Sequence, residues 1–336
     1  MPLRTAPLPR MAGHLSFMRS NRAKAEELQP GTLAVIGVPL ESSESIMSGA
    51  RFSPLAIRET SVYFGWYANP QFSNPTDVNA RDAIDKSSIN ERLFDLGDVP
   101  VVGLARSEAD EHITHTIEKV FARGATSVVL GGDNTIVAPI ARGITHGIGN
   151  GKTVAFIQIG GRMPGTTCAK SESRSSSVPL DALLIDGNIK LADTTILAPV
   201  GHPTAEFAQE MTDSGAKIIS SRQLNDMDSD AITDLAFTLS NRELPVIVNL
   251  DLSSVAAELH GMSDRPTFDG MSMELLQQVL VAIGRAPIVT LIVTGLYPTT
   301  NGLSIVKTGQ RLIVTALLGY IRARLGLFNV PDSDTN

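Results

Sequence analysis

The sequence predicts an α/β protein, a three-layer α/β/α sandwich around a mostly parallel sheet of about eight strands. Short runs of apolar and often β-branched residues recur along the chain without polar alternation, which is typical of strands buried on both faces. Stretches with apolar residues at helical spacing separate these runs. Because crossover helices cover both faces of a parallel sheet, the alternation of the two patterns indicates this architecture.

The predicted elements follow one another in a regular order. The strands are expected at residues 32–38, 126–132, 153–159, 194–200, 216–221, 244–250 and 286–293. The helices between them are expected at residues 54–64, 108–123, 135–144, 205–214, 228–241 and 272–284. Ligands of such sheets bind beyond the carboxyl ends of the strands, so functional residues are expected directly after each strand.

Length and composition bound the domain organisation. The chain has 336 residues, of which 43% are hydrophobic and 19% charged, so it can bury a large core. No linker-like stretch divides its middle. We therefore predict one domain over residues 31–328, with an N-terminal arm of residues 1–30 and a tail of residues 329–336.

Charge and cysteine usage exclude several functional classes. The net charge of -7 argues against the broad basic surface that nucleic acids require. The single cysteine cannot form an internal disulfide, and no apolar run is long enough to cross a bilayer. We expect a soluble, cytoplasmic protein without nucleic-acid or membrane partners. The first 25 residues have several basic and no acidic residues, which also suits organelle import, but prolines there favour a flexible arm.

Five segments carry a family resemblance. They are SGARFSPLAIRETS (48–61), FDLGDVP (94–100), VVLGGDNTI (128–136), LDLSS (250–254) and TGQRLIVTALLGYIRARL (308–325). In this order they resemble the motifs of the ureohydrolase family, the arginases and agmatinases, across residues 31–325. The first segment is more similar to agmatinases than to arginases. The resemblance implies the arginase-like fold, hydrolysis of a guanidino C–N bond, and assembly as trimers or hexamers.

The resemblance also implies two manganese ions held by six ligands: a His after GGD, three residues of a DAHxD segment, and both acids of a DxD pair. Such a pair of ions can activate a bridging hydroxide. The six ligand positions fall on Asn134, Gly160, Arg162, Pro164, Asp251 and Ser253. Of these six residues, only Asp251 has a metal-binding carboxylate. One carboxylate, one amide and one hydroxyl cannot neutralise two divalent ions. We predict that the two manganese ions are absent and that no cofactor replaces them.

Two neighbouring residues have simpler interpretations. Asp133, with the glycines before it, is expected to cap the following helix. Arg162 has two alternatives: it forms an ion pair with Asp251, or it points into solvent.

These observations favour a pseudoenzyme without ureohydrolase activity that has a regulatory, scaffolding or ligand-binding role, although enzymatic activity stays open. The alternative is a divergent guanidino hydrolase, either metal-free or with a site rebuilt from His202, His260, Asp264 and Asp251. The expected partners are copies of the same chain, an active relative, or a small metabolite, such as one of polyamine metabolism, in the old cleft.

Overall fold

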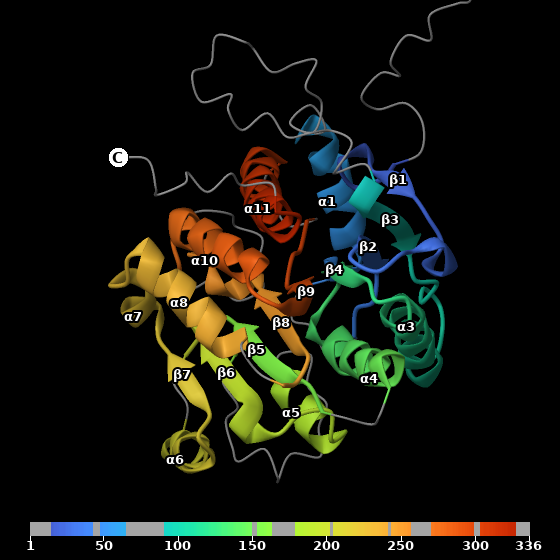
Figure 1. Cartoon of the computed structure of the whole chain (residues 1–336). Helices are drawn as coiled ribbons and strands as arrows, with labels where there is room; N and C mark the ends of the chain where they lie inside the picture. The colour runs from blue at the N-terminus through green and yellow to red at the C-terminus, as the bar shows by residue number, and fades with distance from the viewer. Residues whose placement is uncertain are drawn as a thin grey trace, which may run out of the picture.

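The computed structural model is built around one parallel sheet of nine strands in the order β1-β3-β2-β4-β9-β8-β5-β6-β7. The structure describes residues 15–42, 48–64, 91–149, 153–162, 179–201, 204–240, 243–256, 270–298 and 303–326. Every pair of neighbouring strands is parallel. β9 lies between β4 and β8 although it is the last strand in the sequence (Figure 1).

The strands are β1 Asn21–Arg22, β2 Leu33–Val38, β3 Leu93–Asp98, β4 Thr126–Gly131, β5 Ala155–Ile159, β6 Thr194–Leu197, β7 Lys217–Ile219, β8 Val246–Asp251 and β9 Ile288–Thr294. The principal helices are α1 Ser53–Ser61, α3 Arg106–Phe121, α4 Val137–Ile148, α5 Pro179–Ile185, α6 Ala205–Ser214, α7 Ser221–Asn225, α8 Ser229–Ser240, α10 Met273–Arg285 and α11 Leu303–Arg324.

Two hydrophobic cores cover the two faces of the sheet. One contains buried residues of α1, α8, α10 and α11, and the other contains buried residues of α3, α4, α5 and α6. Figure 1 shows α8, α10 and α11 on one side of the strands and α3, α4 and α5 on the other. Successive strand residues alternate between the cores: Val128 and Leu130 pack into the first, and Val129 into the second. The three-layer prediction is confirmed.

The sheet has one strand more than the expected eight. All seven predicted runs form strands, and the GD segment contributes β3. The further strand is β1, which has only two exposed polar residues and therefore no hydrophobic signal. It lies in the segment that was expected to be an arm, where Phe17 and Met18 are buried against the domain. The predicted boundaries at residues 31 and 328 stay predictions.

A buried ion cluster ties α1 to β3 and to this N-terminal segment. Arg58 of α1 donates to both carboxylate oxygens of Asp95 (2.8 and 2.9 Å) and to Asp98 (2.5 Å). The backbone N–H of Phe17 donates to Asp95 (2.6 Å). Burial disfavours the charge on Arg58, but the bonds and charges of the two aspartates outweigh this effect and raise the pKa of Arg58 above its usual value. The cluster explains why the chain folds back at this edge.

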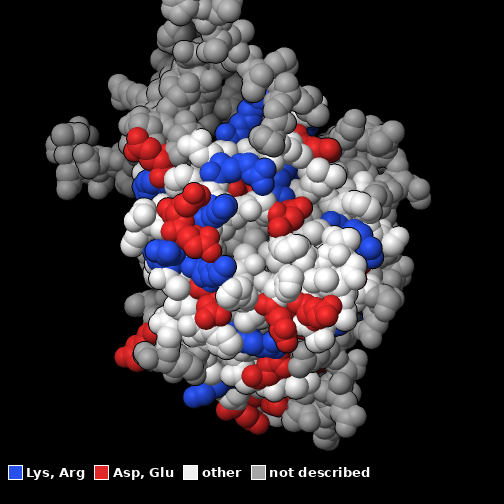
Figure 2. Space-filling view, turned by 90° about the vertical axis from the view of Figure 1, so that its right-hand side faces the viewer, with Lys and Arg blue, Asp and Glu red and all other residues white. Residues whose placement is uncertain are grey.

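The surface over α3 and α4 carries interspersed charges of both signs (Figure 2). Several are paired, among them Arg106 with Asp110 (2.7 Å) and Lys119 with Glu26 (3.1 Å). Within the described residues, no helix has the length and apolarity needed to cross a membrane.

Candidate functional site

The candidate site lies where β4, β5, β8 and β9 end. These four strands are neighbours at the centre of a parallel sheet, so their carboxyl ends meet at one edge. Asn134 starts the 3₁₀ turn after β4, and Asp251 is the last residue of β8. Three polar side chains from inside the strands join them: Gln158 of β5, Asn249 of β8 and Thr294 of β9.

Strand alternation directs these side chains to one face. Phe156, Ile247 and Ile292 pack into the core formed with α3 and α4. Because side chains repeat every second residue, Gln158, Asn249 and Thr294 lie on the same face, one step closer to the strand ends. The register pairs Gln158 with Asn249 and Asp251 with Thr294. The polar residues are therefore neighbours across three strands.

Asn134 is the centre of the resulting hydrogen-bond network. Its Nδ2 donates to Oδ2 of Asp251 (2.6 Å), and its Oδ1 accepts from Nδ2 of Asn249 (2.9 Å) and Oγ1 of Thr294 (2.7 Å). Nδ2 of Asn249 also donates to Oε1 of Gln158 (3.0 Å). All five residues are buried. The amide at the position of the family's histidine ligand is thus fully engaged with its neighbours.

Asp251 and Ser253 complete the network at the end of β8. Oδ1 of Asp251 accepts from the backbone N–H of Ser253 (2.9 Å), and Oγ of Ser253 accepts from the backbone N–H of Gly161 (3.2 Å). Both oxygens of the Asp251 carboxylate therefore accept hydrogen bonds from neutral donors. The side chain itself is only 5% exposed.

Arg162 does not pair with Asp251. Its side chain is exposed, and its backbone forms a bridge to Val200 beyond the end of β6. Of the two alternatives for Arg162, the structure has the solvent-facing one and no ion pair with Asp251. The two consecutive glycines before Arg162 turn the chain outward, so its side chain does not follow the direction of β5.

Asp133 acts as the predicted cap. Its Oδ1 accepts from the N–H and the hydroxyl of Thr135, and its Oδ2 accepts from the N–H of Ser42 (2.7 Å). Gly132 lies under the loop at Leu40, where a Cβ atom would come within 1.7 Å of the Leu40 carbonyl oxygen. The GGD motif here holds the backbone of two loops together.

Glycines enclose the carboxylate of Asp251. Gly160 and Gly161 have φ of +74° and +73°, which L side chains rarely adopt. A Cβ atom at Gly160 would lie 2.4 Å from Cβ of Ser254, and one at Gly295 would lie 2.7 Å from Oδ1 of Asp251. Side chains at these positions would collide with the network. Pro164, His202, His260 and Asp264 lie outside the described residues.

The described residues at these strand ends do not make up the ligand set of a pair of manganese ions. The donor set consists of one carboxylate, side-chain amides and hydroxyls, and the carboxylate faces an amide N–H. Two divalent ions need several anionic or imidazole ligands. Among the residues that the structure describes, no three His, Cys, Asp or Glu side chains are grouped so as to hold a metal ion.

Sequence reasoning missed Gln158, Asn249 and Thr294. Each is a buried polar residue in or at the end of a mostly apolar strand, at the position where its side chain shares a face with the strand-end residues. That interruption was a usable signal, since buried polar groups require partners. The identity of the partners depends on strand order, which the sequence does not show directly.

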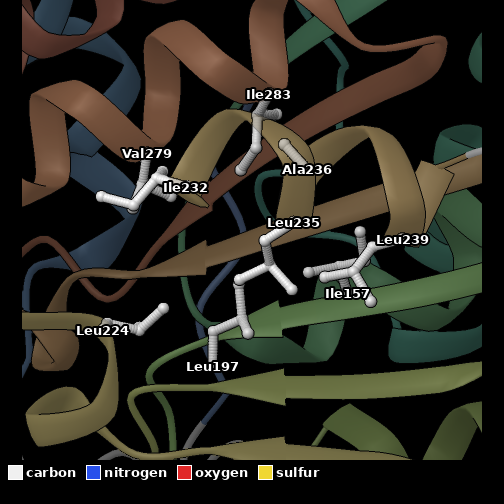
Figure 3. Close-up of a pocket in the computed structure, with 9 residues that line it drawn as sticks. All are labelled: Ile157, Leu197, Leu224, Ile232, Leu235, Ala236, Leu239, Val279 and Ile283. Atoms are coloured by element: carbon white, nitrogen blue, oxygen red, sulfur yellow. The ribbon is translucent and has the colours of Figure 1, made fainter. Parts of the chain in front are cut away.

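A separate apolar cavity lies between α8, α10 and the sheet (Figure 3). Its lining consists of Ile157, Leu197, Leu224, Ile232, Leu235, Ala236, Leu239, Val279 and Ile283. It offers no polar group to orient a ligand, which small-molecule sites use for specificity. We therefore assign it to imperfect packing.

The chain is similar to a protein-family model and to several known enzymes. A model of the arginase family matches residues 32–318. Guanidinobutyrase of Pseudomonas aeruginosa is 30% identical over 210 residues, which are 61% of each chain. The human mitochondrial guanidino acid hydrolase is 37% identical over 116 residues, which cover 30% of that protein. Agmatinase of Cronobacter sakazakii is 22% identical over 292 residues, 86% of this chain and 87% of that one. The chain thus spans less than two thirds of the first two relatives.

Solved structures share the fold at lower identity. Proclavaminate amidino hydrolase of Streptomyces clavuligerus superimposes with a TM-score of 0.72 at 17% identity, covering 95% of this chain and 100% of the other. A hypothetical agmatinase of Burkholderia thailandensis superimposes with a TM-score of 0.73 at 19% identity, covering 95% and 93%.

Proposed function

The chain belongs to the arginase family, and we propose that it is a member without the binuclear manganese cluster and without ureohydrolase activity, acting through binding or scaffolding. One observation carries the proposal. Of the described residues at the ligand positions that the resemblance implies, Asp251 alone carries a carboxylate, and it is engaged by Asn134 and the Ser253 backbone. A site with this donor set has no means to generate a metal-bound nucleophile.

The residues at the site support binding more than chemistry. The described network offers no general base beside a nucleophile, because its amides do not titrate and Asp251 is enclosed. In this proposal a small metabolite or a partner protein would meet the rim, where Arg162 is exposed. We further propose that the chain assembles with copies of itself or with an active relative. Its cytoplasmic location is part of the same proposal, and imaging of the tagged full chain tests it.

A divergent hydrolase is the second candidate. It is favoured by the similarity to an agmatinase over 86% of the chain and by relatives named as guanidino hydrolases. In that case the activity would depend on ligands outside the described residues, such as His202, His260 and Asp264, together with Asp251.

One combined measurement separates the two candidates. Purified full-length protein is analysed for bound metal and assayed for urea release from agmatine, arginine and guanidinobutyrate in excess Mn²⁺, beside an active family member. We expect neither stoichiometric metal nor turnover. Metal together with turnover would establish the hydrolase. Thermal shifts with polyamine-pathway metabolites then test binding, because a ligand of the native state raises the unfolding midpoint.

A further inference from the structure

In the polar network at the strand ends, the amide hydrogens face acceptor oxygens. Asn249 uses both hydrogens of Nδ2, one toward Asn134 and one toward Gln158. The single hydroxyl hydrogen of Thr294 has its shorter contact with Oδ1 of Asn134 (2.7 Å), and Oδ1 of Asn249 lies farther away (3.2 Å). If the amide of Asn134 were turned over, its oxygen would face the Asp251 carboxylate and its nitrogen would face the Nδ2 donor of Asn249. Only one orientation of the Asn134 amide therefore suits its neighbours.

The network joins four strands. Gln158 belongs to β5, Asn249 and Asp251 to β8, and Thr294 to β9, while Asn134 follows β4 by three residues. An Asn134 side chain that bonds β8 and β9 therefore also connects both strands to the start of α4. Buried hydrogen bonds of this kind are costly to break, because each lost partner leaves a buried polar atom that neither protein nor water can satisfy.

The same geometry opposes a cation. The N–H of Asn134 points at Oδ2 of Asp251, so the hydrogen occupies the direction from which an ion would approach that oxygen. The backbone N–H of Ser253 points at Oδ1 in the same way (2.9 Å). A metal ion bound at either of these positions would first have to displace a hydrogen-bond donor.

We infer that Asn134, Asp251, Asn249, Gln158 and Thr294 form a cation-excluding hydrogen-bond lock, which holds the ends of β4, β5, β8 and β9 together where a metal pair would otherwise lie. The inference rests on the proposed function, since it assigns a role to the same residues in the absence of manganese. It adds that the five residues of the lock stabilise the native state together as one hydrogen-bonded unit. Their role therefore goes beyond the absence of metal ligands.

Double-mutant cycles test this cooperation, measured as unfolding midpoints of the full chain in EDTA. Asn134→Ala and Thr294→Val remove two members of the lock. Thr290→Val is the matched control, because Thr290 shares a buried bond with Ser127 (2.6 Å) that joins the same two strands, β4 and β9, outside the lock. We expect Asn134→Ala to lower the midpoint by roughly 5–10 °C and Thr294→Val by roughly 2–5 °C.

The comparison of two double variants tests whether the lock residues act together. The double variant of Asn134 and Thr294 should lose less than the sum of the single losses, by about 2 °C or more, whereas Asn134→Ala with Thr290→Val should be additive. Additivity in both pairs would overturn the lock. If Asn134→Ala does not fold, Gln158→Met replaces it in the cycle, since Gln158 and Asn134 both accept from Nδ2 of Asn249, and Asn134 also accepts from Thr294.

The two proposals fail separately. Urea release by the unmodified protein would refute the proposed function and would leave the measured coupling unchanged. Loss of coupling without any metal or turnover would refute the lock and leave the pseudoenzyme proposal in place.

Discussion

Replacing Asn134 by Asp should convert the lock into a weak cation site. The change is isosteric, but it puts an oxygen where Nδ2 now donates to Asp251 at 2.6 Å. The variant loses a hydrogen bond to a charged group, about 1.5–3 kcal/mol, and two carboxylates roughly 4 Å apart repel by about 4 kcal/mol at an effective dielectric constant of 20. After relaxation we expect a net loss of about 3–5 kcal/mol in unfolding free energy at pH 8.

A divalent ion should restore much of this loss in the variant alone. Mn²⁺ at about 100 times its dissociation constant adds about 2.7 kcal/mol to the stability of a native state that binds one ion. The assay is urea unfolding of the unmodified protein and the variant, in EDTA and in excess Mn²⁺. Asn225→Asp is the control, because Asn225 is exposed at the end of α7. The reasoning is refuted if Mn²⁺ stabilises the unmodified protein, or if Asn134→Asp is as stable as that protein in EDTA.

Two further predictions concern the buried polar groups away from the site. Arg58→Met should cost about 3–5 kcal/mol in urea unfolding, because it leaves Asp95 buried without a cation, whereas adding Asp95→Asn should recover part of the loss, since a neutral amide still offers an acceptor to the Phe17 backbone N–H. Lys119→Ala, which breaks a pair whose two side chains are 44% and 53% exposed, should cost at most about 1 kcal/mol, and equal costs for Arg58→Met and Lys119→Ala would contradict this account. Tyr320→Phe should stabilise the protein at pH 7 by about 1–2 kcal/mol, since the Tyr320 hydroxyl is buried without a hydrogen-bond partner among the described residues. Burial raises the pKa of Tyr320 from 10.0 to about 12, so its neutral form contributes stability below pH 10 that is lost as the pH rises toward 12, and the Phe variant should lack this loss while the exposed Tyr63→Phe control retains it.

Most strands could be predicted from the sequence, because a strand buried on both faces consists of consecutive apolar residues. The runs at 32–38 and 244–250 became β2 and β8 almost residue for residue. β1 could not be predicted, since its two polar residues have no apolar pattern, and their pairing with β3 is supported by the long-range bonds that Phe17 and Met18 make with Asp95 and Ser61. A long-range hydrogen bond leaves no periodic signal in the sequence.

The candidate site was predictable in part. The resemblance led to Asn134, Asp251 and Ser253, and the structure brings these three together. It separates Arg162 from them, because two left-handed glycines turn the chain after β5. No sequence pattern ranked an exposed Arg162 above an ion-paired one, since both conformations suit a glycine-rich loop.

The sequence by itself determined the α/β class and the approximate strands, and it led to the prediction that metal ligands are replaced at the strand ends, because hydrophobic patterning and residue chemistry are local properties. Only the tertiary structure decided that Asn249, Gln158 and Thr294 surround Asn134. Their contacts depend on β9 lying between β4 and β8 and on the register of three strands. Hydrogen-bond partners are chosen by that packing, so the sequence names the donors and acceptors but the fold pairs them.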